Sequence, residues 1–434
     1  MLEASGMNTR NAADLPEGFK MTELGPLPEE WRVVRLGEVV SLRRGTVDPA
    51  KAGYRRYVGL EHIQPGNVRL TSWGDPCSVK SAKAVFKPGD ILFAKLRPYL
   101  DKAAIAESEG ICSTDILVLT PGEHIDNWYF AFLAHHPFVL NHAISTTTGV
   151  NHPRTSWRAL SVGLIPLPPI PEQRAIAHVL RTVQRAKEAT ERVIAALKEL
   201  KKSLMKHLFT YGPVPLDQAD QVPLKETEIG PVPEHWNVVQ LGEILKLRKG
   251  TIHPDEVPNA RYVGLEHLDS GKIWIRRFGK ASDTKSAKAV FKTGDILYGK
   301  LRPYLDKAAL AEWDGVCSTD ILVLTPQDDF DAVFTAYLIH SSFVLAHAVA
   351  TTTGVNHPRT SWRALKQAAI PLPPLDEQHE ITRILQTVDR KIEAEENRKR
   401  ALEALFKTLL HHLMTARVRL PEAFISRFEE VHHG

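Results

Sequence analysis

One stretch decides the fold: Thr146-Thr-Thr-Gly-Val-Asn-His-Pro-Arg-Thr-Ser-Trp-Arg-Ala-Leu160 recurs without a change as Thr351–Leu365, 205 residues further on. Working outward, Ser81–Ala104 matches Ser286–Ala309 with three differences, and the same offset relates the two halves from Thr22 to Thr415. A repeat of about 200 residues has the size of a domain. The 434-residue chain is therefore predicted to be a duplicated domain and not a solenoid of small repeats.

Each copy predicts an α/β domain followed by a long helix. The α/β part opens at Leu24–Trp31 and Ile229–Trp236 and closes at Ile165–Gln173 and Ile370–Gln378, where prolines end one element and an acidic residue starts the next. The fold class is thus two duplicated α/β domains joined by two long antiparallel coiled-coil helices. The predicted segments are a flexible tail 1–21, domain 22–171, helix 172–210, linker 211–226, domain 227–376, helix 377–415 and a tail 416–434.

The helices are predicted from a heptad pattern. Apolar residues in 172–210 step by alternating three and four residues, as in a coiled-coil seam. The second copy places Lys391, Glu395 and Arg398 in the middle of its seam, which predicts a polar centre or a local shift of register to Ile392. The predicted helix or subunit pairing residues are Ile176, Val183, Leu197, Leu200, Leu204, Ile381, Val388, Leu402, Leu405 and Leu409.

The helices should pair with each other. A helix of this length would extend ~60 Å at 1.5 Å per residue, and its apolar stripe needs a partner. The alternative is a helix packed entirely on its own domain. The linker 211–226 is short, so antiparallel pairing and a pseudo-two-fold relation between the domains are predicted. The first helix has the more apolar seam, so a fragment 1–211 is expected to pair with a second copy of itself.

Composition excludes several classes. The three cysteines, Cys77, Cys112 and Cys317, form no CxxC pair, and a reducing, cytoplasmic setting is expected. Cys112 and Cys317 are predicted to be small buried strand residues. Because the N-terminus is polar and long apolar runs are absent, we expect the protein to be neither secreted nor inserted in a membrane. A net charge of +4 is too weak alone to identify a nucleic-acid partner.

Catalytic motifs are missing from both copies. No glycine-rich cofactor loop follows a strand, and no HExxH pattern is present. The segment Gly294–Leu301 imitates a phosphate-binding P-loop, but Leu301 replaces the hydroxyl residue and Ala94 replaces the second glycine in the first copy. The chain is predicted to be non-catalytic, with no cofactor or metal of its own.

Two shared clusters instead predict a DNA-binding surface. The segment Ile91–Arg97 is predicted to be a strand whose Leu92, Ala94 and Leu96 face the core, leaving Lys95 and Arg97 on the other face. Cationic side chains on a rigid strand suit phosphate contact or guanine recognition. The alternative is a solvated face. The first cluster comprises Lys95, Arg97, Tyr99 and Lys102, with Lys300, Arg302, Tyr304 and Lys307 in the second copy.

The second cluster is the polar loop Thr147–Trp157. Polar loops on rigid scaffolds carry binding. Trp157 and Trp362 are expected to anchor the loop to the core. The predicted DNA-binding residues are Thr147, Asn151, His152 and Arg154, with Thr352, Asn356, His357 and Arg359 in the second copy. Where the copies differ, the candidates for tuning base preference, or for neutral drift, are Arg55, Arg56, Gln64, Arg69, Arg261, Lys272, Arg276 and Arg277.

These motifs together resemble the specificity (S) subunit of type I restriction-modification systems. The resemblance rests on the Leu-Pro-x-x-Trp opening, the Gly-Asp-Ile-Leu strand with Lys-Leu-Arg-Pro-Tyr-Leu, and Ile-Pro-Leu-Pro-Pro-x-x-Glu-Gln before a long helix, all present twice. It implies that each domain reads one half of a split double-stranded DNA target and that the helices bind two methyltransferase (M) subunits. S-adenosylmethionine, ATP and magnesium would belong to the M and restriction (R) subunits.

Three alternatives remain at the level of sequence. The chain could serve a modification-only adenine methyltransferase complex, it could be a self-contained DNA-modifying enzyme, or it could be a scaffold without DNA binding. The repeated Lys/Arg/Tyr cluster argues against the scaffold, and the missing cofactor loops argue against the enzyme.

Overall fold

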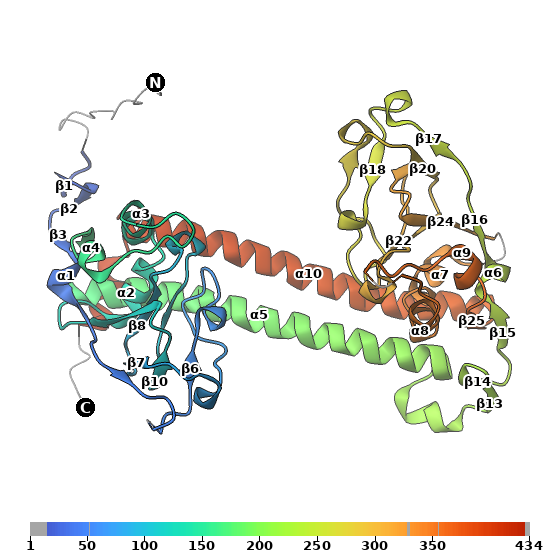
Figure 1. The fold of residues 1–434 in the computed structure, drawn as a ribbon, viewed down its shortest axis with the longest axis horizontal. Coiled ribbons are helices and arrows are strands. Elements are labelled where there is room, and N and C mark those ends of the chain that lie inside the picture. The colour runs from blue at the N-terminus through green and yellow to red at the C-terminus, as the bar shows by residue number, and fades with distance from the viewer. Residues whose placement is uncertain (1–14, 52, 328–329, 355, 430–434) are drawn as a thin grey trace. The chain divides into compact units, whose positions relative to one another are not determined.

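Two four-stranded sheets form the body of the first unit, which lies within residues 1–191 and 398–434. The structure, a computed structural model, describes residues 15–51, 53–327, 330–354 and 356–429 (Figure 1). Its strands are β1 (Phe19–Thr22), β2 (Gly25–Pro28), β3 (Arg32–Arg35), β4 (Val40–Leu42), β5 (Thr46–Val47), β6 (Tyr57–Val58), β7 (Lys83–Phe86), β8 (Ile91–Ala94), β9 (Ala103–Ile105), β10 (Gly110–Cys112), β11 (Ile116–Pro121) and β12 (Leu164–Leu167). Its helices are α1 (Leu36–Val39), α2 (Asn127–Leu133), α3 (Pro137–Ser145), α4 (Trp157–Leu160) and the first part of α5 (Ile170–Tyr211).

The sheet β4-β11-β8-β9 is buried on both faces. Ile91 and Phe93 of β8 belong to the core beneath α2 and α3, whereas Leu92 belongs to a second core on the opposite face. The predicted alternation between a core face and a solvent face in this strand is therefore wrong. A strand covered on both sides is apolar throughout. Because β8 ends at Ala94, Lys95 and Arg97 follow the strand and do not lie on its face.

The second unit, within residues 192–397, repeats this arrangement. The strands are β13 (Leu224–Thr227), β14 (Gly230–Pro233), β15 (Asn237–Gln240), β16 (Leu245–Leu247), β17 (Thr251–Ile252), β18 (Arg261–Val263), β19 (Gly279–Lys280), β20 (Lys288–Phe291), β21 (Ile296–Gly299), β22 (Ala308–Leu310), β23 (Gly315–Cys317), β24 (Ile321–Pro326) and β25 (Ala369–Leu372). Its sheets have the orders β16-β24-β21-β22 and β17-β20-β23-β18-β19, and the other strands pair as β13-β14 and β15-β25. The helices are α6 (Leu241–Ile244), α7 (Ala332–Leu338), α8 (Ser342–Ala350), α9 (Trp362–Leu365) and the first part of α10 (Leu375–Met414). The duplicated α/β design predicted from the repeat is confirmed.

The repeated Pro-Pro-x-x-Glu-Gln motif fastens each long helix to the opening of its domain. The indole of Trp31 donates a hydrogen bond to the Glu172 carboxylate at 2.7 Å, and Trp236 donates to Glu377 at 2.8 Å. The buried Gln173 amide donates to the Pro168 carbonyl at 2.8 Å. Buried polar groups need such partners, which explains why tryptophan, glutamate and glutamine recur together.

The long helices pair antiparallel within each unit. In the first unit, Ile176 of α5 shares a core with Met414 of α10, and Glu191 lies 2.9 Å from Lys399. In the second unit, Lys198 and Lys201 of α5 pair with Glu396 and Asp389 of α10, at 3.3 and 2.7 Å. In both units, the partner residues on α10 fall in number as the residues on α5 rise in number. The two helices are therefore antiparallel, as predicted.

The predicted seam shifts by one residue in the second half of α5. Val193 and Leu200 are 43% and 48% exposed, whereas Ile194 and Lys201 are 8% and 9% exposed. Leu405 of α10 is also exposed, so Leu200 and Leu405 are wrong as helix-pairing residues. The heptad pattern predicted Leu200 at the buried position because only apolar residues were placed in the seam. In the structure, the neighbouring Lys201 is buried there instead.

The remaining pairing residues are buried or half-buried. Ile176 and Ile381 are buried; Val183, Leu197, Leu204, Val388, Leu402 and Leu409 are half-buried. Ile392 is buried and Lys391 is exposed, which confirms the predicted register shift. Glu395 is buried as well, beside Lys391 at 3.2 Å, so the centre of this helix is also polar.

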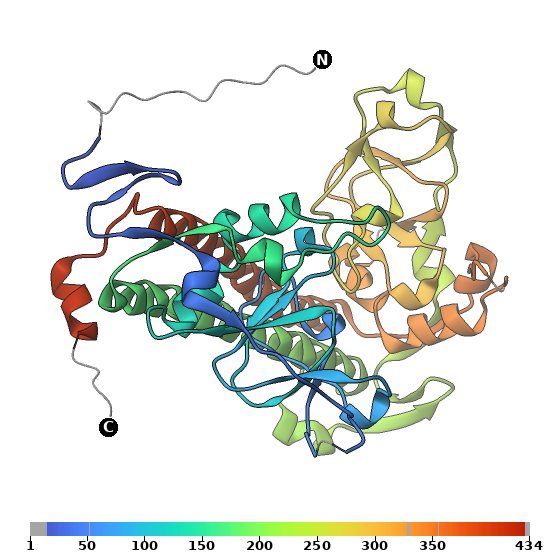
Figure 2. The same ribbon diagram turned by 60° about the vertical axis from the view of Figure 1, so that its left-hand side comes forward.

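The expected tails are partly structured. Residues 1–14 and 430–434 lie outside the described residues, but Phe19–Thr22 forms β1 and pairs with β2. At the other end, α11 (Glu422–Ile425) lies beside the start of α5 (Figure 2). Arg419 lies 3.0 Å from Glu172, and the rings of Phe428 and His178 are 5.4 Å apart. The segment 416–429 is therefore packed against the first unit and is not a free tail.

No single helix in the described part of the chain is long and apolar enough to cross a membrane. One bent pair, α7 with α8, meets the length and composition criteria jointly, with an angle of 55° between the two helices.

Candidate nucleic-acid interface

The two predicted clusters form one surface in each unit. In the first unit, the Arg97 amide donates to the Pro153 carbonyl at 2.8 Å, and the Thr155 amide donates to the Lys95 carbonyl at 3.0 Å. In the second unit, the Arg302 amide donates to Pro358 at 2.7 Å. Residues 95–101 and 147–155 therefore lie side by side, and residues 300–306 do so with 352–354 and 356–360 in the second unit. We call each pair of segments a contact surface.

The first segment of each contact surface has an unusual backbone. Arg97 and Asp101 adopt positive φ angles of 50° and 51°. A left-handed backbone is unfavourable for residues with a Cβ atom and persists where surrounding contacts enforce it. Arg302 and Asp306 have φ angles of 50° and 49°. The same strain at four positions marks a conformation that both copies retain.

A buried histidine holds this strained turn in place. His135 lies with Nδ1 2.7 Å from Asp101 Oδ1, and His340 lies 2.6 Å from Asp306. The imidazoles of His135 and His340 are almost fully buried. Because each carboxylate is anchored, the turn presents Tyr99 to solvent with 53% exposure. Sequence reasoning missed these histidines, although the 34-residue spacing from aspartate to histidine is the same in both copies.

The second segment is a tight loop. Gly149 has φ 92°, and a Cβ atom there would lie 3.2 Å from the His152 carbonyl oxygen. The bridge between Thr148 and Arg154 closes the loop, and Val150 at its tip is 97% exposed. Trp157 packs against the core and starts α4, as predicted for an anchor.

The predicted DNA-binding residues divide by environment. Arg97, Tyr99, Asn151, His152, Arg302, Tyr304, Asn356, His357 and Arg359 are exposed, while Lys95, Lys102, Thr147, Arg154, Lys300, Lys307 and Thr352 are half-buried. The ammonium groups of Lys102 and Lys307 donate to the Leu60 and Leu265 carbonyls at 2.6 Å. These two lysines stabilise their own domains. Arg154 lies 3.1 Å from Asp115, so the second segment is partly neutralised.

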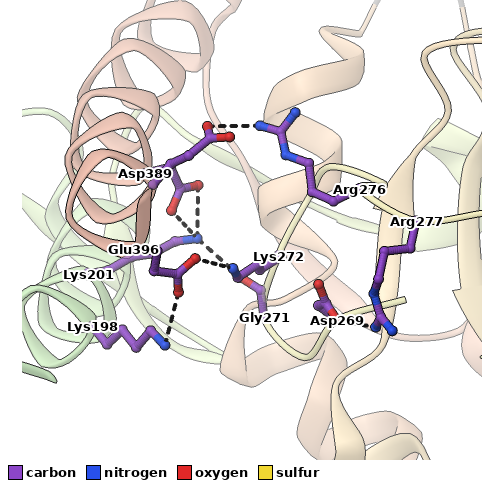
Figure 3. Close-up of polar contacts among 10 residues, drawn as sticks. Lys198, Lys201, Asp269, Gly271, Lys272, Arg276, Arg277, Asp389 and Glu396 are labelled. Atoms are coloured by element: carbon purple, nitrogen blue, oxygen red, sulfur yellow. Dashed lines mark hydrogen bonds and ion pairs between the residues drawn. The ribbon is translucent and has the colours of Figure 1, made fainter. Parts of the chain in front are cut away.

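Most of the candidates for tuning base preference have partners within their own unit. Arg69 lies 2.8 Å from Glu107, and Arg56 stacks 4.1 Å above the Trp73 ring. Arg261 stacks on Phe278 and Trp313. The ammonium of Lys272 lies 2.7 Å from the Glu396 carboxylate of α10 (Figure 3). Arg276 pairs with Glu393, and Arg277 pairs with Asp269. Arg55 and Gln64 are exposed. The contacts of Lys272 and Arg276 hold the second domain to α10, whereas those of Arg56, Arg261 and Arg277 lie within the α/β domain.

The two cysteines of strands β10 and β23 are buried. Burial raises the pKa of both Cys112 and Cys317 to about 12, so these thiols stay protonated at neutral pH. Within the described part of the chain, no group of three or more His, Cys, Asp or Glu residues could hold a metal ion.

A family model described as the type I restriction modification DNA specificity domain matches residues 28–199 and 233–404. The chain belongs to this family. Each match covers one α/β domain and most of the helix that follows, so the chain carries two specificity domains, as the resemblance indicated.

Relatives and solved structures extend the comparison over most of the chain. The specificity subunit of type I restriction enzyme MjaVIII from Methanocaldococcus jannaschii is 24% identical, with 93% of this chain and 96% of that protein covered. The EcoDI specificity subunit from Escherichia coli is 24% identical over 83% of this chain and 81% of its own length. The crystal structure of a type I S subunit from M. genitalium has a TM-score of 0.54 at 15% identity, covering 88% of this chain and 96% of that one. This last likeness shows a shared fold.

Proposed function

We propose that this chain is the DNA-recognition subunit of a type I restriction-modification complex, in which each specificity domain reads one half of a split target. Double-stranded DNA and two M subunits are its proposed partners, with R subunits in the complete complex. The chain itself would be non-catalytic. The observation that carries the proposal is the contact surface, which occurs in both units with the same residues and the same strained backbone.

The chemistry of the contact surface suits DNA. Arg97 is exposed and held at its backbone by Pro153, and such a preorganised guanidinium can donate to phosphate or to guanine. The neighbouring Tyr99 offers an exposed ring and hydroxyl. Lys102 leaves the set of proposed DNA contacts because its ammonium is engaged by Leu60.

The helices supply a candidate docking surface for an M subunit in each unit. In the second unit, Val193 and Leu200 of α5 are 43% and 48% exposed; in the first unit, Leu405 of α10, the repeat equivalent of Leu200, is 45% exposed. Exposed apolar residues on a helix that already buries another face fit a protein partner. We therefore assign Leu200 and Leu405 to subunit docking and not to pairing of the two helices.

The test uses the chain assembled with its M subunits. Arg97→Ala and Arg302→Ala should weaken DNA binding, measured by fluorescence anisotropy at several salt concentrations. Loss of a phosphate contact weakens binding to all sequences and lowers the salt slope by about one, whereas loss of a guanine contact costs roughly 1 to 3 kcal/mol at one base pair. Arg35→Ala removes an equal charge from β3, outside the contact surface, and should leave binding unchanged.

Unchanged affinity in both contact-surface variants would contradict the proposal. A second measurement tests the division of labour between subunits. A preparation of this chain free of M subunit should transfer no methyl group from S-adenosylmethionine to DNA and hydrolyse no ATP. Detectable methyl transfer would favour the self-contained enzyme instead.

A further inference from the structure

The contact between the helices in the second unit is built around a buried charge. The ammonium of Lys201 on α5 lies 2.7 Å from Asp389 of α10 and donates to the Gly271 carbonyl at 3.2 Å (Figure 3). The Tyr337 hydroxyl donates to the same Asp389 carboxylate at 2.7 Å. The residue Lys201 is only 9% exposed. Its charge is therefore satisfied by a partner helix and a domain loop, and its ammonium also lies 5.2 Å from the centre of the Tyr337 ring of α7.

The equivalent contact in the first unit carries no such charge. The repeat places Phe406 where the second unit has Lys201, Gln184 in place of Asp389, and Phe132 in place of Tyr337. The rings of Phe406 and Phe132 are 5.8 Å apart. Gln184 is 2% exposed and donates to Asn67 at 3.1 Å. One unit thus uses a salt bridge at the position where the other uses an aromatic pair.

The two contacts are mutually incompatible. If the first-copy helix met a second copy of itself in the same register, Lys201 would face Phe132 and Gln184 without its aspartate. The nearby Glu188 already accepts from Gln184 and lies 3.2 Å from Arg69. If α10 met its own copy, Phe406 would face Asp389 and leave that carboxylate without its cation. Removing one partner of a buried ion pair is strongly unfavourable.

We propose that these two trios, Lys201-Asp389-Tyr337 and Phe406-Phe132-Gln184, form a pairing code that directs α5 to α10 and rejects either helix from a second chain. The code is a property of the helix pair and does not depend on what the domains bind. It opposes the self-pairing of a 1–211 fragment that the more apolar first seam predicts. A cation at position 201 counts against that dimer because its partner lies on α10.

An exchange in the full-length chain tests this code without changing composition. The double variant Lys201→Phe with Phe406→Lys places a phenylalanine opposite Asp389 in the second unit and a lysine opposite Phe132 and Gln184 in the first unit. We expect the apparent unfolding midpoint to fall by at least about 5 °C. In this variant each helix would instead suit its own copy on another chain, so light scattering should show a larger share of species with twice the parental mass.

A rescue variant separates the code from ordinary core disruption. Adding Gln184→Asp, Asp389→Gln, Phe132→Tyr and Tyr337→Phe to the exchange transplants each trio into the opposite unit. This sixfold variant should recover at least half of the lost midpoint and return to the parental mass distribution. The code is overturned if the exchange leaves midpoint and mass unchanged, or if the sixfold variant is no better than the exchange alone.

Discussion

At the scale of single residues, the strained turns at Arg97 and Arg302 show what a contact surface costs. A left-handed conformation costs an ordinary residue roughly 1 kcal/mol or more, and glycine carries no such penalty. Glycine would be the choice if the turn served only the fold. Arginine at both equivalent positions indicates that the guanidinium is needed there, which agrees with a binding role.

The strained backbone at Arg97 gives a prediction with two separate measurements, stability and DNA affinity. Arg97→Gly and Arg97→Ala remove the same guanidinium, but only glycine relieves the φ of 50°. We expect Arg97→Gly to be more stable than Arg97→Ala by about 1 kcal/mol, measured by chemical denaturation. Both variants should lose DNA affinity to a similar extent. Equal stability of the two would mean that the turn is not strained.

A second residue-scale prediction concerns pH. The His136 ring stacks 5.7 Å from His411 of α10, and burial followed by the charge of His411 lowers the pKa of His136 from 6.5 to about 4. Because the unfolded chain binds this proton more readily, stability is full above pH 6.5 and falls as the pH drops toward 4. The loss is on the order of 3 kcal/mol.

The test compares two histidines. His136 Nδ1 accepts from the Phe138 amide at 3.3 Å, so His136→Asn keeps a cap acceptor while removing the titrating group. This variant should flatten the dependence of the unfolding free energy on pH between 4 and 6.5. His152→Asn, at an exposed loop position, should retain the full dependence. An unaltered profile in His136→Asn would show that another group titrates.

At the scale of elements, periodicity predicted the long helices well and the strand faces poorly. The 172–210 pattern places the helix within two residues of its bounds, Ile170–Tyr211, because no proline or glycine interrupts it. β8 is covered by two cores, so alternation could not identify a solvent face. The shift of the seam to Lys201 depends on Asp389, a residue far away in sequence, and no local pattern contains that information.

The corrected seam predicts that substitutions at two aliphatic residues of α5 change the unfolding free energy by different amounts. Ile194 is 8% exposed in the helix pair and Leu200 is 48% exposed on α5. Ile194→Asp should lower the unfolding free energy by roughly 3 kcal/mol because it buries an unpaired carboxylate, whereas Leu200→Asp should change it by less than about 0.5 kcal/mol. Comparable losses in both variants, measured by thermal or denaturant unfolding, would restore the seam predicted from the heptads.

At the scale of the whole molecule, the repeat predicts two domains of the same fold. The constant offset of 205 residues means that the segments of both copies follow in the same order without insertions. The candidate surface was predicted in its residues but not in its geometry. Lys95 and Thr147 are far apart in sequence, and only the folded chain joins their segments. The tuning candidates were the least predictable, since Arg276 and Lys272 find their carboxylates on α10.

The proposed docking of M subunits gives a prediction at this scale. Leu200→Asp and Leu405→Asp should leave the isolated chain folded, since both positions are exposed, but should impair assembly with M subunits, measured by co-purification and light scattering. Lys202→Asp, at another exposed position on α5, is the matched control for introducing a carboxylate. Assembly equal to that of the parent in both leucine variants would move the docking surface away from these helices.

The duplicated contact surfaces predict the form of the proposed DNA target. The loop Thr146–Leu160 is identical to Thr351–Leu365, and α5 and α10 pair antiparallel in both units, so we predict two half-sites of similar sequence in inverted orientation. If both domains enter one face of the duplex, the half-sites lie about 10 to 10.5 base pairs apart, centre to centre. Mapping methylated adenines on DNA treated with the M-containing complex tests this. Two unrelated half-sites would show that the divergent residues, among them Arg55 and Gln64, set base preference and that the identical loop contacts only the phosphate backbone.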